Sequence, residues 1–142
     1  MQVAVFQLNN NVLYAIDINN VIAFIIKKDI VLNKMPTDTK KISGIATIRG
    51  EPITILNLDI WMNEDLNEND LEYNLIIYSK INNKEYGFLI KNMIGIYEVK
   101  DNELGIISNS KIRNTIYIDI NNKKELCLLL DYDNFLKNIK RD

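Results

Sequence analysis

The side chains that most often perform catalysis are scarce in this sequence. It contains no histidine, and histidine is the commonest general base and metal ligand near neutral pH. Its single cysteine, Cys127, lies in an apolar run, a position typical of a buried structural thiol rather than of a nucleophile. No glycine-rich phosphate-binding loop is present. The sequence therefore predicts that this protein is not an enzyme.

Several carboxylates stand close enough in sequence to suggest acid–base or metal chemistry. Two close pairs are Asp101 with Glu103 and Asp131 with Asp133. Short acidic pairs of this kind are more often loop or helix-cap residues than a catalytic dyad. A third group, Asp65, Glu68 and Asp70, lacks the spacing and the glycine of a calcium-binding loop. We therefore expect no metal site and no cofactor.

The length, composition and net charge of the chain argue against several classes of protein. A chain of 142 residues predicts a single domain over residues 1–142, and 47% hydrophobic residues suit a globular core. A net charge of −2 provides no basic surface for nucleic acid. No apolar run is long enough to span a bilayer, and the first residues read as a strand rather than a signal peptide. We expect a cytoplasmic protein that does not insert into membranes and is a monomer when isolated.

Residues 42–58 form the most structured stretch of the sequence. Apolar residues stand on both sides of Arg49-Gly50, and glycine takes the positive φ angles of a hairpin corner without steric cost. The stretch therefore predicts a β-hairpin with Arg49 at its tip. Two interpretations of Arg49 remain open at this point: an ordinary solvated turn residue, or a planar donor group that a rigid hairpin presents to a partner.

The rest of the chain also reads mainly as short strands. Residues 3–8 and 12–16 predict a hairpin around the asparagines at 9–11, and residues 23–32 predict a further strand interrupted at 27–29. Residues 59–62 predict a short helical cap anchored by Trp61. Residues 63–70 are acidic and rich in asparagine, which predicts a linker between two halves.

The two halves resemble each other at a constant shift of 72 residues. Tyr14 matches Tyr86, Val21 matches Met93, and Leu58-Asp59 matches Leu130-Asp131. A repeat of this length predicts two similar units rather than a solenoid. Each unit has about five strands separated by turns, which is typical of a small antiparallel barrel. We place the units at about residues 1–66 and 67–142, with exchange of strands between them left open.

The hairpin at residues 42–58 closely resembles the pattern G-V-x-N-L-R-G-x-x-x-P-V-I-D-L of the CheW family of chemotaxis coupling proteins. Gly44, Ile48, Arg49, Gly50 and Leu58 match it. Thr54 and Asn57 replace the usual proline and aspartate. The likeness covers nearly the whole chain, but residues 104–109 lack the family's proline and residues 115–119 lack its glycine. The resemblance implies an all-β fold of two packed five-stranded SH3-like barrels with short helical caps.

The resemblance also implies a function and a set of contact residues. Proteins of this family are adaptors without enzymatic activity, which join the cytoplasmic tip of a methyl-accepting chemotaxis receptor to the regulatory domain of the histidine kinase CheA. The family's receptor site maps onto Val21, Ala23, Phe24, Arg49, Ile76 and Ile96. The kinase contact maps onto Ile42, Gly44 and Glu51. Ala23 stands where the family often has an acidic residue.

Two other functions remain open from the sequence. One is a generic SH3-like module that binds nucleic acid or a proline-rich peptide, although the acidic balance and the scattered tyrosines oppose it. The other is a diverged scaffold of the CheW type that serves a different signalling partner, which the departures in the second half favour.

Overall fold

The chain folds mainly into β-strands, as the sequence predicts. The computed structural model describes residues 1–34, 39–100, 104–106 and 111–141. The strands are β1 (Gln2–Gln7), β2 (Leu13–Asp17), β3 (Val21–Ile26), β4 (Ile42–Ile48), β5 (Glu51–Asn57), β6 (Leu75–Ile81), β7 (Lys84–Ile90), β8 (Asn92–Glu98), β9 (Leu104–Ile106), β10 (Ile112–Ile120) and β11 (Lys123–Leu130). The α-helices are α1 (Leu58–Met62) and α2 (Tyr132–Arg141), and short 3-10 turns cover Ile18–Asn20, Lys27–Asp29 and Glu68–Asp70.

The strands form two open sheets that exchange strands between the halves of the chain. The first sheet has the order β8-β1-β2-β11-β10-β9, and the second has the order β3-β6-β7-β5-β4. Strands β1 and β2 therefore pair with strands of the second half, while β6 and β7 pair with strands of the first. The segment at 63–70 does not separate the sheets, because strands on both sides of it pair in the second one. The all-β architecture of two packed, barrel-like sheets is confirmed, although in the part of the chain that the structure describes neither sheet closes and the first has six strands.

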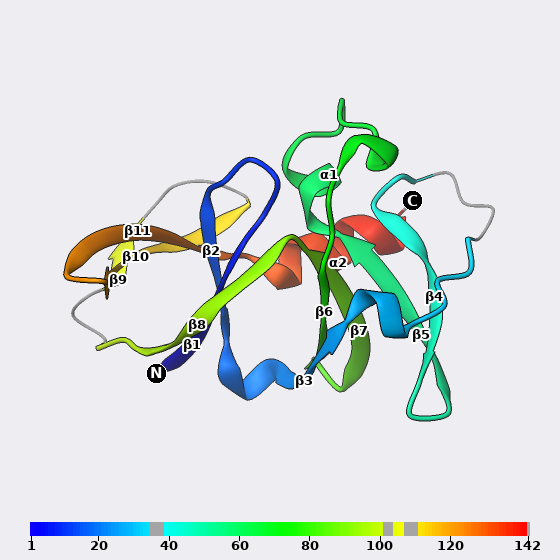
Figure 1. Ribbon diagram of the computed structural model, residues 1–142, viewed down its shortest axis with the longest axis horizontal. Helices are drawn as coiled ribbons and strands as arrows, with labels where there is room; N and C mark the ends of the chain where they lie inside the picture. The colour runs from blue at the N-terminus through cyan, green and yellow to red at the C-terminus, as the bar shows by residue number, and fades with distance from the viewer. Residues whose placement is uncertain (35–38, 101–103, 107–110, 142) are drawn as a thin grey trace.

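The 72-residue repeat is visible in the strands and in their turns. The turn Arg49-Gly50 joins β4 to β5, and the turn Asn121-Asn122 stands 72 residues later between β10 and β11. Both turns place two consecutive residues at positive φ, 53° and 81° in the first and 51° and 64° in the second. Such two-residue turns match the right-handed twist of paired strands. Figure 1 shows these two hairpins at opposite ends of the molecule.

The largest apolar cluster lies between the two sheets. This inter-sheet cluster includes Ala4 and Phe6 from the first sheet and Ile77 and Phe88 from the second. Helix α2 lies in the middle of the molecule (Figure 1), and its buried face adds Tyr132, Phe135 and Leu136 to the cluster. The Trp61 ring is 4.5 Å from the Phe135 ring, measured between centroids. A smaller cluster, here called the second-sheet cluster, contains Ala46, Ile48, Ile53, Ile55, Ile76, Tyr78 and Leu89.

Two elements differ from the sequence-based expectation. Helix α2 has ten residues rather than the length of a short cap, because apolar residues recur at 132, 135, 136 and 139 along one helical face. Asp131 starts this helix by accepting a hydrogen bond from the Asn134 amide at 3.1 Å. The third strand ends at Ile26, since residues Lys27–Asp29 form a 3-10 turn instead of an interruption within a longer strand.

Gly44 is required by a close approach of two backbone segments. Its φ angle is 152°, and a Cβ atom at this position would lie 2.4 Å from the Asn33 carbonyl oxygen. That oxygen accepts a hydrogen bond from the Ile45 amide at 2.9 Å, so it cannot move away without losing the bond. We expect Gly44→Ala to lower the free energy of unfolding by about 2–3 kcal/mol in urea titrations. Gly50→Ala is the matched control: it shares a positive φ of 81° but meets nothing within 4 Å, so an equal loss in both variants would contradict the proposed clash.

Candidate functional site

Four exposed apolar side chains stand on the free edges of the two sheets. Among the described strands, β3 is one of the two edges of the second sheet and β8 is one of the two edges of the first. Phe24 and Ile26 on β3, and Ile94 and Ile96 on β8, are all exposed. We call these four residues the apolar edge surface. Large hydrophobic side chains gathered in this way are a feature of surfaces that bind partners.

The pairing of β3 with β6 explains which way its side chains point. Residues directly opposite each other in an antiparallel pair share one face of the sheet. Phe24 is opposite Ile77 and Ile26 is opposite Leu75, and Ile77 and Leu75 lie in or against the inter-sheet cluster. Phe24 and Ile26 therefore face the space between the sheets. Phe24 remains 37% exposed, because none of the described strands pairs with the outer side of β3.

Strand β8 presents its side chains in the same way. Ile96 is opposite Ala4 of β1, and Ala4 belongs to the inter-sheet cluster. Ile96 is nevertheless 52% exposed. Ile96 therefore faces the side on which Phe24 lies, from the other sheet.

Asn74 links the end of β3 to the start of β8. Its carbonyl oxygen accepts a hydrogen bond from the Lys27 amide at 3.0 Å. Its side-chain amide donates to the Lys91 carbonyl at 2.9 Å and to the Asn92 side-chain oxygen at 3.0 Å. The backbone and side-chain hydrogen bonds of Asn74 therefore hold the end of β3 close to the start of β8. They fix the relative position of the two strands that carry the apolar edge surface.

The remaining predicted receptor residues lie in different environments. Val21 is half-buried and packs against the inter-sheet cluster. Ala23 is opposite Tyr78 and packs against the second-sheet cluster, on the other face of β3. Ile76 is 0% exposed and belongs to the second-sheet cluster, so it cannot touch a partner of the folded protein. Ile26 and Ile94, which sequence reasoning missed, are exposed beside Phe24 and Ile96.

Arg49 extends from the corner of the β4–β5 hairpin and lies over an aromatic ring. Its guanidinium carbon is 5.6 Å from the centroid of the Tyr78 ring on β6, within the range of a cation–π interaction. The described residues place no carboxylate in ion-pair contact with Arg49. The Arg49 guanidinium therefore lies over the Tyr78 ring, while its N–H donors remain exposed to solvent.

The three predicted kinase residues belong to one hairpin but not to one surface. Ile42 is opposite Leu56 at one end of the β4–β5 pair, and Glu51 is opposite Ile48 at the other. Seven residues of extended strand separate these ends by about 20 Å. Glu51 is exposed, Ile42 packs partly against the inter-sheet cluster, and Gly44 is buried. Ile42 and Glu51 therefore lie at opposite ends of the hairpin, and Gly44 has no side chain to present to a partner.

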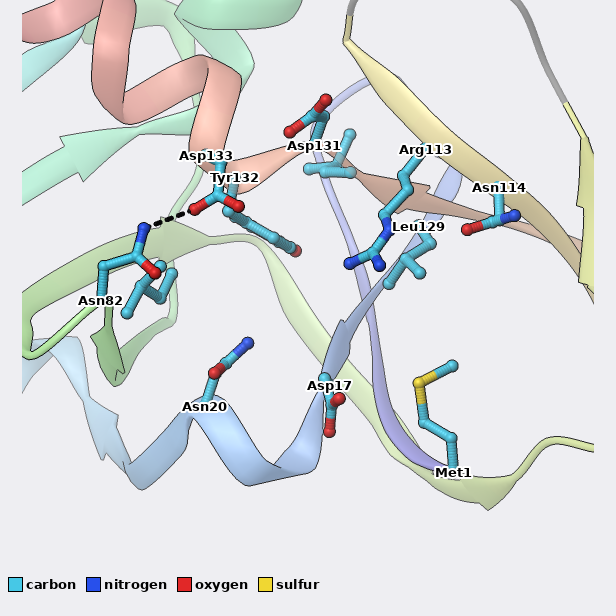
Figure 2. A pocket seen from close by; sticks show the side chains of 12 residues that line it. Met1, Asp17, Asn20, Asn82, Arg113, Asn114, Leu129, Asp131, Tyr132 and Asp133 are labelled. Carbon is cyan, nitrogen blue, oxygen red and sulfur yellow. Dashed lines mark hydrogen bonds between the residues drawn. The ribbon is translucent and has the colours of Figure 1, made fainter. Parts of the chain in front are cut away.

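Three of the residues considered for catalysis are buried or form hydrogen bonds within the protein: Cys127, Asp131 and Asp133. Burial raises the pKa of the Cys127 thiol to about 11, so the thiol is protonated at neutral pH and a poor nucleophile. Asp131 caps α2, and Asp133 accepts a hydrogen bond from the Asn82 side chain at 2.7 Å. These two carboxylates line a cavity of about 230 Å³, with Arg113 and Asp17 on its walls (Figure 2). Asp101 and Glu103 lie outside the described residues.

Among the described residues, no group of three or more His, Cys, Asp or Glu side chains is arranged to hold a metal ion. No helix in the described part of the chain combines the length and apolar character needed to cross a membrane.

A buried carboxylate on α1 is the main polar feature that sequence reasoning missed. Asp59 accepts a hydrogen bond from the Asn9 amide at 3.0 Å and another from the Asn9 side chain at 2.8 Å. Burial raises the pKa of the Asp59 carboxyl above its ordinary value of 3.8, and the Asn9 bonds oppose that shift. Residues 9 and 59 are far apart in sequence, so no local pattern indicated this contact.

The raised pKa of Asp59 predicts a pH-dependent stability. A folded-state pKa above the unfolded one stabilises the protein below the unfolded value and loses that contribution as pH rises through the folded value. We expect the free energy of unfolding of wild type to fall relative to Asp59→Asn as pH increases from about 4 towards 7. Asn9→Ala should steepen the decline, because it removes bonds that lower the pKa. Urea titrations across this range test the prediction, and a pH-independent difference would contradict it.

Comparisons with known proteins agree with this architecture. The family model for the CheW-like domain matches residues 2–140. No curated protein sequence matches the chain. Among solved structures, the crystal structure of the scaffolding protein TtCheW from Thermoanaerobacter tengcongensis matches with a TM-score of 0.75 and 18% sequence identity, over 92% of this chain and 88% of that one. The two sheets, the exchanged strands and the match over nearly the whole sequence lead to one conclusion: this chain belongs to the CheW-like domain family.

Proposed function

We propose that this protein is a non-enzymatic adaptor of bacterial chemotaxis, which joins the cytoplasmic tip of a chemoreceptor to the regulatory domain of the histidine kinase CheA. Membership of the CheW-like domain family supports the general role. The proposal places the protein in the cytoplasm, where both partners present these parts. It assigns no chemical step to the protein, in keeping with the buried, protonated Cys127 thiol and the absence of histidine.

The observation that carries the proposal is the apolar edge surface. Phe24 and Ile26 stand on one sheet edge, and Ile94 and Ile96 stand on the other. A helix that docks by its apolar face needs anchors of this kind on its partner. The receptor tip, a helical hairpin in this family, has a suitable shape, and we place it across the two edges. Val21 forms the partly buried base of this contact.

Arg49 and Ala23 extend the proposed receptor contact around β3. They lie on the face of β3 and β6 that carries Tyr78, opposite to the face of Phe24. Because β3 is an edge strand, a partner along its free edge can reach side chains of both faces. We place the kinase contact at the β4–β5 hairpin, with the exposed Glu51 as its direct contact and Ile42 and Gly44 supporting the backbone.

Binding of purified fragments tests the proposed function. A soluble receptor-tip fragment and the CheA regulatory domain are each titrated against the chain by calorimetry, and the three-component mixture is sized by light scattering. We expect the chain to run as a monomer alone, to bind each fragment, and to form a ternary complex. Binding to neither fragment would overturn the proposal, and binding to one alone would indicate a scaffold for a different pathway. Salt-dependent binding to an oligonucleotide, or binding to a proline-rich peptide instead, would indicate a generic SH3-like module.

A further inference from the structure

The Tyr78 ring has a position that its role in the core does not require. Tyr78 is only 3% exposed and belongs to the second-sheet cluster. One face of its ring nevertheless lies under the Arg49 guanidinium, with 5.6 Å between the guanidinium carbon and the ring centroid. Arg49 itself is exposed. A buried aromatic residue therefore supports an exposed cation.

This contact lies on the face of the second sheet that carries the second-sheet cluster. In the strand order β3-β6-β7-β5-β4, the hairpin that carries Arg49 lies at one end, and β6, which carries Tyr78, is next to the other. The opposite Cα partner of Tyr78 is Ala23 on the edge strand β3. The Arg49 contact therefore connects the hairpin corner to the strand pair that forms the proposed receptor edge.

A second bond fixes the ring itself. The Tyr78 hydroxyl donates a hydrogen bond of 2.7 Å to a Glu85 side-chain oxygen on β7. The ring is also surrounded by cluster members from β4, β5, β6 and β7. Packing and this hydrogen bond together fix the ring orientation, so the guanidinium stacks on a rigid surface.

We propose that Tyr78 is the positioning residue for Arg49, and that its ring holds the guanidinium against β6, beside Ala23, where a partner on the β3 edge can accept hydrogen bonds from it. The inference rests on the proposed adaptor function and goes beyond it by assigning a role to a residue that no partner touches. A guanidinium held on a ring loses less conformational freedom on binding than one that moves freely in solvent. Tyr78 raises affinity by this restriction alone.

The test distinguishes the contribution of the Tyr78 ring to receptor binding from the contributions of its hydroxyl and of core packing. Tyr78→Leu removes the ring, and Tyr78→Phe keeps the ring but removes the bond to Glu85. Ile55→Val removes one methylene from the same cluster without touching Arg49, which controls for a loosened core. Each variant is measured below its melting transition, by calorimetry with the receptor-tip fragment. The Arg49 side-chain proton shifts of the free protein are recorded by NMR, because a ring beneath the guanidinium shifts them upfield.

We expect Tyr78→Leu to weaken receptor binding about threefold to fivefold and to abolish the upfield shifts. Tyr78→Phe should retain the shifts and bind within about twofold of wild type, and Ile55→Val should behave like wild type. In an Arg49→Ala background, Tyr78→Leu should have no further effect, because its influence passes through Arg49.

Two results overturn the inference while leaving the proposed function intact: wild-type affinity in Tyr78→Leu, or the same loss from Tyr78→Leu with and without Arg49. Absent upfield shifts in wild type would also overturn it, whatever the affinity. Failure of wild type to bind the receptor fragment, with the shifts present, would instead overturn the adaptor function and with it the role assigned to Tyr78.

Discussion

Replacing Phe24 by aspartate is expected to weaken binding of the receptor-tip fragment by about a hundredfold and to leave binding of the kinase regulatory domain nearly intact. An unpaired carboxylate that becomes buried in an apolar contact costs a few kcal/mol, and each 1.4 kcal/mol is a factor of ten in affinity. In the free protein the same carboxylate stays in water, because Phe24 is partly exposed on an edge strand. The loss should therefore appear in binding rather than in folding.

The structure provides matched variants for this prediction. Ile96→Asp places the same charge on the other edge and should have a similar effect. Tyr117→Asp is the control, because Tyr117 is also an exposed apolar strand residue, 55% exposed, but lies on β10, across the first sheet from β8. It should leave receptor affinity unchanged. If Phe24→Asp abolishes both interactions together with the thermal transition, Phe24 acts as a core residue and the receptor edge is placed wrongly.

Arg49→Ala is expected to weaken receptor binding about tenfold to a hundredfold. Hydrogen bonds that involve a charged donor contribute about 1.5–3 kcal/mol, and the hairpin turn and the Tyr78 ring hold the Arg49 backbone and side chain in place. Arg49→Lys should restore only part of the affinity, because an ammonium keeps the charge above the ring but not the planar array of donors. Calorimetry with the receptor-tip fragment measures both variants.

Melting curves on the same Arg49→Ala samples distinguish binding from structure. A cation–π contact at an exposed site contributes about 0.5–1 kcal/mol to stability, so the melting temperature should fall by only a few degrees. A fall of many degrees, with wild-type affinity in the folded fraction, would mean that Arg49 holds the second sheet together. That result would contradict the proposed role of Arg49 in receptor binding.

Much of the fold could be predicted from residue types and their spacing. Alternating apolar residues and turn residues predicted the strands, and the constant shift of 72 residues predicted two related units with matching hairpins. The resemblance around Arg49-Gly50 identified the family, which the match over residues 2–140 confirms. The length of α2 was missed, although its apolar face is present in the sequence.

The candidate site could be predicted only in part. Alternation along a strand fixes that Ile76 and Ile77 point to opposite faces, but both faces of β6 are covered and neither residue is exposed. The exposed neighbours of Phe24 depend on which strands are edges, and strand order is a property of long-range pairing.

The sequence by itself determined the strand content, the repeat, the positive-φ turn that presents Arg49 and the absence of histidine, because each depends on residue type or on spacing along the chain. Only the tertiary structure decided that β1 and β2 join the strands of the second half, that β3 and β8 remain as free edges, and that Asn9 reaches the buried Asp59. It also decided that Tyr78, 29 positions beyond Arg49 in the chain, lies beneath its guanidinium. The strand exchange and the free edges share one physical reason: two repeats with the same pattern can pair strands within or between themselves with similar local energies. The packing of the shared inter-sheet core selects one arrangement.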